Sequence, residues 1–373
     1  MERTFTRMDT KAVKGVAVFC MVAHHLFYSE SRRPIGMPEI HWTLDGMIAG
    51  MSLESALVNF VKIVVSAFFF FSGYGLYKQA KKGSFKLEKK ILGLYTEYWK
   101  VFFIFIPIGF VFFHNQPDYF PDTLFCHVFQ DFHLQDVASA LLCWTTPYNQ
   151  EWGFISVYLF CIVAGYIYYR LTEGRKLGFW VELLLVLVIE FGVNGVQFLP
   201  QYGFLPVALV KIFPRGLTFG CSVFMGIVFA RYDVLDTWVA RGVDKFTKLG
   251  IAVFSLGILV GMVYMRLLII QGADADLVFT PLFIIAWAML LRVLPPLYKL
   301  MAFLGKYSTG IWLIHTFYCY YYYPAVLLTH ISGYLWLDFV ILMAMSVVSA
   351  MAVDKFWSLL PVRKAIGLLQ KAD

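Results

Sequence analysis

Two histidines lie inside long apolar segments of this chain, where a side chain that can carry charge is costly and is by default a functional candidate. His25 falls within the first apolar block, and His315 falls within FLGKYSTGIWLIHTFY near the other end of the chain. An imidazole with a pKa near 6.5 can take a proton near neutral pH or act as a nucleophile. The structural alternative for each is a histidine that only bonds a neighbouring helix, and spacing alone leaves both interpretations open.

Lys14 precedes His25 by eleven residues in the same segment. On a helix this spacing is a rise of about 16 Å and a rotation about 20° beyond three full turns, so the two side chains point the same way. His24 points about 100° away from that line. A cation at the entrance and an imidazole half-way down suit an anionic cofactor that threads a flexible arm into the membrane. His25 would then act as a general base at the tip of that arm.

Other charged or polar groups carry weaker signals. Arg215, Lys211 and Glu190 fall in apolar segments, where they either pair with one another or face a water-filled cavity. The lysine-rich stretch KQAKKGSFKLEKK includes Lys89 and Lys90. Its positive charge either only sets the orientation of the chain in the membrane or also binds phosphate groups.

Aromatic and histidine-rich stretches are further candidates for binding sites. The run YCYYYYP is typical of an interfacial aromatic belt, with a sugar-stacking platform as the alternative. His114, Cys126, His127 and His133 match no zinc-binding spacing, so no metal is expected. The chain has no Walker loop, no GxSxG turn and no HExxH helix, which argues against ATP-driven transport, serine hydrolysis and zinc proteolysis.

The elements that position these residues follow from composition. Hydrophobic residues make up 60% of the chain and charged residues 15%, whereas roughly 25% charged residues are usual in a soluble domain. Continuous apolar blocks of helical length predict an all-α, polytopic transmembrane helical bundle. At about 20 residues per span, the chain holds about ten spans. We expect residues 1–373 to form one transmembrane domain with no appended soluble domain.

Basic residues gather in alternate short loops, which predicts the orientation of the bundle. The basic stretches MERTFTRMDTKAVK and DKFWSLLPVRKAIGLLQKAD place both termini in the cytoplasm, and the loop 114–151, without Lys or Arg, lies outside. The net charge of +7 therefore reflects orientation and gives no footprint for nucleic acid. Arg32 and Arg33 are exceptions, because they fall in an external loop. The expected spans are about 15–29, 61–77, 91–114, 153–170, 179–194, 203–230, 249–270, 277–292, from 305, and 333–353.

Five stretches together resemble the membrane-bound acyltransferase family 3. They are KGVAVFCMVAHHLF, SAFFFFSGYGLYK, QEWGFISVYL, FMGIVFARYDVLD and FLGKYSTGIWLIHTFYCYYY, which occur in family order and span residues 8–355. Lys14 and His25 match the first-span motif of a basic residue followed by histidine. Lys14 stands where many members have arginine, which is not equivalent for a bidentate contact. Lys89 and Lys90 match a basic pair of the family, while Gly93 replaces a further arginine.

The resemblance implies an O-acyltransferase that takes an acyl group, usually acetyl, from a cytoplasmic coenzyme A thioester. The acceptor implied is a hydroxyl of an extracytoplasmic or lipid-linked glycan, so we expect cell-surface glycan modification at a bacterial cytoplasmic membrane. His25 and Lys14 carry over as motif residues, with Lys89 and Lys90 as donor-side contacts. Some relatives carry a soluble esterase-like domain, so this chain either completes the reaction itself or uses a separate extracytoplasmic transferase or a second copy.

These inferences combine into one hypothesis with two rivals. Acetyl-CoA enters from the Lys14 side, its phosphates meet Lys14, Lys89 and Lys90, and the thioester lies near His25 with His315 close by. His25 deprotonates the acceptor hydroxyl or briefly accepts the acyl group itself. The acceptor contacts expected on the outside are Glu151, Trp152 and Arg215. The rivals are a proton-coupled transporter or flippase for a small solute or glycolipid, and a small-molecule sensing or uptake module.

Overall fold

The structure, a computed structural model, describes residues 2–27, 32–41, 47–48, 51–175, 177–196, 207–268 and 276–360. Within those ranges no side chain is described at residues 47–48, 51, 53–55, 59, 193–196 and 207–218. The described chain is helical apart from one antiparallel pair of two-residue strands, β1 (Met47–Ile48) and β2 (Met51–Ser52). The prediction of an all-helical chain is confirmed.

The chain divides into two compact units, each made of three separate stretches. Unit 1 comprises Met1–Ala17, Phe60–Leu87 and Ile155–Gly305, and unit 2 comprises Val18–Asn59, Glu88–Phe154 and Lys306–Asp373. The first helix, α1 (Arg7–Phe27), begins in unit 1 and ends in unit 2. Each unit therefore draws on distant parts of the sequence.

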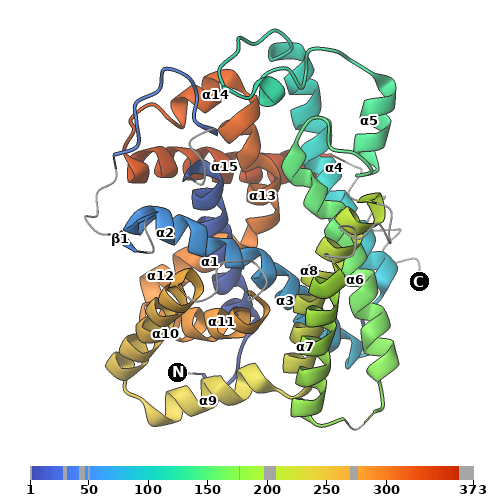
Figure 1. The fold of residues 1–373 in the computed structure, drawn as a ribbon, viewed down its shortest axis with the longest axis vertical. Helices are drawn as coiled ribbons and strands as arrows, with labels where there is room; N and C mark the ends of the chain where they lie inside the picture. The colour runs from blue at the N-terminus through green and yellow to red at the C-terminus, as the bar shows by residue number, and fades with distance from the viewer. Residues whose placement is uncertain are drawn as a thin grey trace. The chain divides into compact units, whose positions relative to one another are not determined.

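Unit 1 is built from long apolar helices that pack side by side. In Figure 1, α3 lies beside α8, and α10 lies beside α11. The elements of this unit after α1 are η2 (Val61–Ile63), α3 (Val64–Ala80), α6 (Gly153–Thr172), α7 (Phe179–Val196), α8 (Val207–Arg231), α9 (Val234–Lys245), α10 (Lys248–Leu268), α11 (Asp276–Val293) and α12 (Pro295–Lys306).

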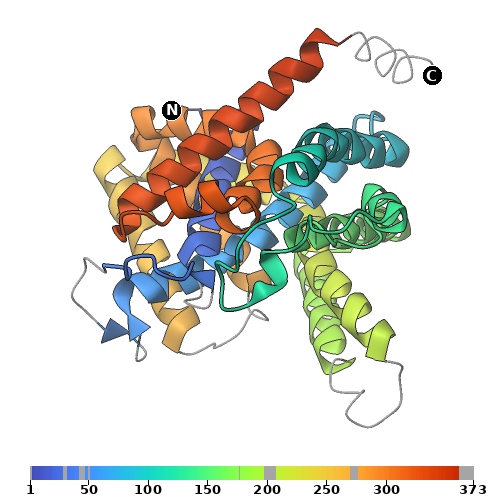
Figure 2. The same ribbon diagram turned by 90° about the horizontal axis from the view of Figure 1, so that it is seen from above.

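Unit 2 holds the C-terminal part of α1 and the last helices of the chain. In Figure 2 the long helix α15 lies against α13. The other elements are shorter, with the exception of α4. They are α2 (Leu53–Phe60), α4 (Leu87–Phe112), η3 (Thr123–Phe125), α5 (Leu134–Leu141), η4 (Gln150–Trp152), α13 (Ser308–Thr316), the π-helix η7 (Phe317–Tyr321), α14 (Tyr323–Leu328) and α15 (Leu335–Leu359).

Among the described residues, six helices are long and apolar enough to cross a membrane. They are Ala56–Ala80, Leu87–Phe112, Gln150–Thr172, Lys248–Arg266, Asp276–Val293 and Leu335–Leu359, with Phe219–Arg231 as a shorter apolar helix. These helices support an integral membrane protein. The count of ten spans and the orientation of the termini stay predictions.

The expected ninth span differs from the structure, which does not contain one continuous helix after residue 305. Helix α13 ends at Thr316, the π-helix η7 follows, and α14 begins at Tyr323 with Pro324 in its first turn. Proline lacks the N–H that an interior helical position needs but is tolerated at a helix start. Pro324 therefore favours a new helix at this point.

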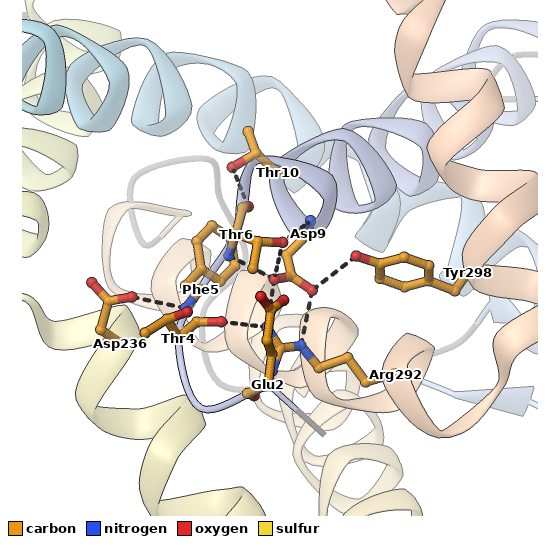
Figure 3. A network of polar contacts seen from close by, with 9 residues as sticks. All are labelled: Glu2, Thr4, Phe5, Thr6, Asp9, Thr10, Asp236, Arg292 and Tyr298. Carbon is orange, nitrogen blue, oxygen red and sulfur yellow. Dashed lines mark hydrogen bonds and ion pairs between the residues drawn. The ribbon is translucent and has the colours of Figure 1, made fainter.

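A buried polar network fixes the start of α1 within unit 1 (Figure 3). Thr6 and Asp9 form a reciprocal cap, in which the Thr6 N–H donates to the Asp9 carboxylate at 2.7 Å and the Asp9 N–H donates to Thr6 Oγ1 at 3.2 Å. Arg292 of α11 binds both Asp9 oxygens, at 2.9 and 2.5 Å, and its guanidinium also donates to the carbonyls of Glu2 and Thr4. The N-terminal segment is thus tied to α11.

Two glycines let α1 and α12 approach within backbone contact in unit 1. A Cβ built on Gly15 would lie 1.8 Å from the Met301 carbonyl oxygen, and one on Gly305 would lie 1.8 Å from the Lys11 carbonyl oxygen. No larger residue fits either position without moving backbone, as is usual where small residues pack membrane helices closely. This contact positions the stretch of α1 that carries Lys14.

The segment between α4 and η4 folds back, so that its helix α5 lies along the first half of α4. Three side chains in the first half of α4, those of Tyr95, Tyr98 and Trp99, donate hydrogen bonds to the carbonyls of residues 140–142 at the end of α5, at 2.7 to 3.0 Å. Tyr98 lies about 21 Å before the end of α4 at Phe112, at 1.5 Å per residue. Because the last carbonyls of a helix have no partner within it, these donors satisfy α5 where it lies along α4.

Candidate active site

His25 lies in the last turn of α1, in unit 2. Its neighbour His24 turns away and donates from Nδ1 to the carbonyl of Val58 at 2.9 Å. The side chain of His25 keeps 16% of its surface exposed, and its Nδ1 is buried with no hydrogen-bond partner among the described residues. His25 therefore has a buried ring nitrogen that no described residue satisfies.

His315 lies beside His25, with 5.1 Å between the ring centroids. Its Nδ1 lies 3.1 Å from the carbonyl oxygen of Ile311 and 2.9 Å from that of Trp312, within its own helix α13. Carbonyl oxygens only accept, so Nδ1 carries the proton and Nε2 carries the lone pair. That Nε2 is buried and has no partner in the described part of the chain.

The π-helix η7 directly after His315 brings two tyrosines to the same site. The Tyr320 hydroxyl donates to the backbone carbonyl of His25, and the Tyr321 hydroxyl accepts the backbone N–H of Gln150 at 2.9 Å. Single π-turns inside helices are frequent at functional sites. Both tyrosines are buried, so this part of the aromatic run packs inside the fold and does not form an open stacking platform for sugars.

Glu151 and Arg32 complete the group of side chains around His25. Glu151 Oε1 lies 3.8 Å from His25 Nδ1 and 3.3 Å from Arg32 Nη1. The guanidinium of Arg32 lies over the rings of Tyr320 and Phe125, at 5.1 and 5.7 Å. Burial disfavours the charged form of Arg32, but Tyr320 and Glu151 outweigh that effect and raise the pKa of Arg32 above its ordinary value. Arg32 therefore stays cationic beside the carboxylate.

The turn that carries Glu151 is fastened to the helix that carries His315. Asn149 Oδ1 accepts the Glu151 N–H at 3.2 Å, and Asn149 Nδ2 donates to Thr316 Oγ1 at 2.8 Å. Trp152 is buried, and its Nε1 donates to the carbonyl of Leu313 at 3.0 Å. Asn149 and Trp152 thus fix the position of Glu151 relative to His315.

The remaining residues predicted from sequence lie elsewhere. Lys14 lies on α1 within unit 1, with Nζ 5.9 Å from the ring centroid of Phe71. Lys89 and Lys90 lie half-buried in the first turn of α4. Arg215 falls on a stretch of α8 whose side chains lie outside the described residues.

Arg32 was not predicted as a site residue, and the tyrosines of η7 were predicted only as part of an interfacial belt or a sugar-stacking platform. The signal for Arg32 was its place in a loop that is predicted to be external, where arginine is unusual. Within the described residues, no cluster of three His, Cys, Asp or Glu side chains is arranged to hold a metal ion.

The arrangement suits proton transfer. Two imidazoles each present a buried nitrogen without a partner in the described structure, and a carboxylate stands beside one of them. Buried polar atoms normally have hydrogen-bond partners, so such atoms mark a place where a ligand or a proton enters.

Comparisons with known proteins agree with the sequence motifs. Neither the curated proteins nor the solved structures give a match to this chain. A family model described as Acyltransferase domain matches residues 10–355, nearly the whole chain. The match includes His25, His315 and Glu151, and it contains all five motifs. The chain therefore belongs to the acyltransferase family 3.

Proposed function

We propose that this chain is a membrane O-acyltransferase that moves an acetyl group from cytoplasmic acetyl-CoA to a hydroxyl of an extracytoplasmic or lipid-linked glycan. Family membership supports the acyltransferase activity. The observation that carries the proposal is the pair of imidazoles, His25 and His315, whose ring centroids lie 5.1 Å apart, with the Glu151 carboxylate 3.8 Å from His25 Nδ1. Acyl transfer to a hydroxyl needs a base of this kind.

On the donor side, we assign Lys14, Lys89 and Lys90 to the phosphates of acetyl-CoA. Lys14 and His25 share the uninterrupted helix α1. At 1.5 Å per residue, their eleven-residue separation is about 16 Å, a length that the extended arm of coenzyme A can cover. Lysine binds phosphate as a point charge. Lys14 can therefore bind a phosphate of coenzyme A although many members of the family have arginine at this position.

The reaction at His25 needs one proton to move. His25 takes the proton of the acceptor hydroxyl as the oxygen attacks the carbonyl carbon of the thioester. The carbon–sulfur bond then breaks, and the imidazolium of His25 returns the proton to the thiolate of coenzyme A. His315 and Glu151 stabilise the imidazolium between these two steps.

For the acceptor to arrive from outside, we infer about ten spans with both termini in the cytoplasm of a bacterial cell. Glu151 and Trp152, with Arg215 as a third candidate, lie on the acceptor side in this scheme. A separate extracytoplasmic transferase or a second copy of the chain remains compatible with it.

The test uses purified full-length protein in liposomes with radiolabelled acetyl-CoA. Release of free coenzyme A together with transfer of label to water or to an added glycan is the expected result. Protein that cleaves no thioester contradicts the proposal. If it carries a solute across the liposome membrane without thioester cleavage, the transporter alternative takes its place.

A further inference from the structure

Glu151 is placed to act on His25 as well as on an acceptor. Its side chain is 14% exposed, and among the described residues its carboxylate forms ion-pair contacts with Arg32 and His25. We propose that Glu151 is a positioning residue that accepts the Nδ1–H of His25 and holds the Nε2 lone pair toward the reactants, with Arg32 fixing the carboxylate. This inference rests on the proposed acyl transfer at His25.

The first argument is the tautomer of His25. A neutral imidazole has one N–H and one lone pair, and an ionised carboxylate only accepts hydrogen bonds. Because Nδ1 is the nitrogen that faces Glu151 Oε1, the proton belongs on Nδ1 and the lone pair on Nε2. The separation of 3.8 Å is longer than a hydrogen bond, as is common for catalytic contacts before substrate binds.

The second argument is that the carboxylate is held from its other side. Arg32 Nη1 lies 3.3 Å from Glu151 Oε1 and 3.3 Å from the Tyr320 hydroxyl. The same hydroxyl donates to the backbone carbonyl of His25. Arg32, Tyr320 and Glu151 therefore form a chain of contacts that begins at the backbone of His25 and returns to its ring.

The third argument comes from His315. Its Nδ1–H is committed to carbonyls of its own helix, so its Nε2 can only accept a hydrogen bond. In any hydrogen bond between the two rings, His25 must be the donor. When His25 is protonated, its Nδ1–H faces Glu151, and its Nε2–H has the His315 lone pair as an acceptor until the thiolate takes the proton.

A purely structural ion pair between Arg32 and Glu151 would also hold the fold, so the experiment must separate the two roles. The informative variant is Glu151→Gln, which keeps the size of the side chain and removes its charge. Glu151→Asp keeps the negative charge but shortens the side chain by one methylene, which moves the carboxylate away from His25. Glu97→Gln is the matched control, because Glu97 also forms an ion pair in unit 2, with Lys100 at 2.6 Å.

The measurements are kcat and KM for acetyl-CoA cleavage, the pH profile of kcat/KM, and the midpoint of thermal unfolding. Glu151→Gln should lower kcat by about 100-fold or more with KM for acetyl-CoA unchanged. The acid limb of the profile should move to lower pH, because the variant lacks a negative charge that favours the protonated imidazole. Glu151→Asp should recover part of kcat, and Glu97→Gln should match the wild type.

A kcat for Glu151→Gln within about threefold of wild type, or an unshifted acid limb, overturns the inference. If that variant does not fold, Glu151→Asp decides: a folded protein with wild-type kcat also overturns it. Failure of the acyltransferase proposal looks different, because the wild-type protein itself would then cleave no acetyl-CoA.

Discussion

The rings of His25 and His315 lie 5.1 Å apart, although the two residues come from opposite ends of the chain. Nδ1 of His25 and Nε2 of His315 are buried, and neither has a hydrogen-bond partner among the described residues. Because the two rings are so close, a proton that binds to one imidazole also acts electrostatically on the other. The pair is therefore a place in unit 2 where a proton taken from a substrate can be passed between two imidazoles.

His315→Ala should lower kcat for acetyl-CoA cleavage by about 100-fold, the lower end of the usual effect of acid–base groups. The reason is that a protonated His25 loses one of its two acceptors. His330→Ala is the control, since His330 is also buried and donates from Nδ1 to the carbonyl of Val326 in the preceding helix α14. Equal losses in the two variants would mean that His315 has only a structural role.

The positions of Lys14 and His25 could be predicted from the sequence, because helical spacing depends only on local geometry. The structure confirms that one helix carries both. The sequence also allowed His25 and His315 to meet, since each was placed within an apolar segment, and the structure brings them together. Hydropathy and periodicity were enough for these features.

Arg32 and the break after Thr316 could not be predicted in the same way. The contact of Arg32 with Glu151 joins two irregular segments, whose course depends on tertiary packing and not on periodicity. The π-helix η7 has the same apolar and aromatic composition as a continuous span. Pro324 was the only local sign that the helix would restart.

Lys14→Ala should raise the KM for acetyl-CoA by about tenfold, which corresponds to about 1.4 kcal/mol, with a smaller change in kcat. The proposed contact is with a phosphate, so Lys14→Arg should keep the wild-type KM. Steady-state kinetics with varied acetyl-CoA measure both. Lys11→Ala is the control, because Lys11 lies exposed on the same helix. An unchanged KM for Lys14→Ala would remove Lys14 from the donor site.

Asp9→Asn should destabilise the protein by about 3 kcal/mol or more, because it leaves the buried guanidinium of Arg292 without its counter-charge. The shift in the unfolding midpoint measures this effect. Asp244→Asn removes a comparable but exposed partner, that of Arg3, and should change stability by less than about 0.5 kcal/mol. Similar shifts in the two variants would show that the network at the start of α1 contributes little.

Tyr98→Phe should cost about 1–3 kcal/mol of stability, since the carbonyl of Ala140 would lose its buried donor. Because α5 lies along α4, the same variant should also make Cys143 react faster with a thiol reagent added to the folded protein. Tyr264→Phe, at an exposed position, is the control. Unchanged stability and thiol reactivity in Tyr98→Phe would contradict the placement of α5.

The most direct test of the account is the cleavage of acetyl-CoA by His25→Ala, compared with His24→Ala and the wild type. His24 is bonded to the Val58 carbonyl and has no part in the proposed reaction, so its variant should keep most of the activity. His25→Ala should fold, bind acetyl-CoA and lose activity by about 1000-fold, within the range for an acid–base group. A folded His25→Ala protein that cleaves acetyl-CoA at the wild-type rate would contradict the central claim.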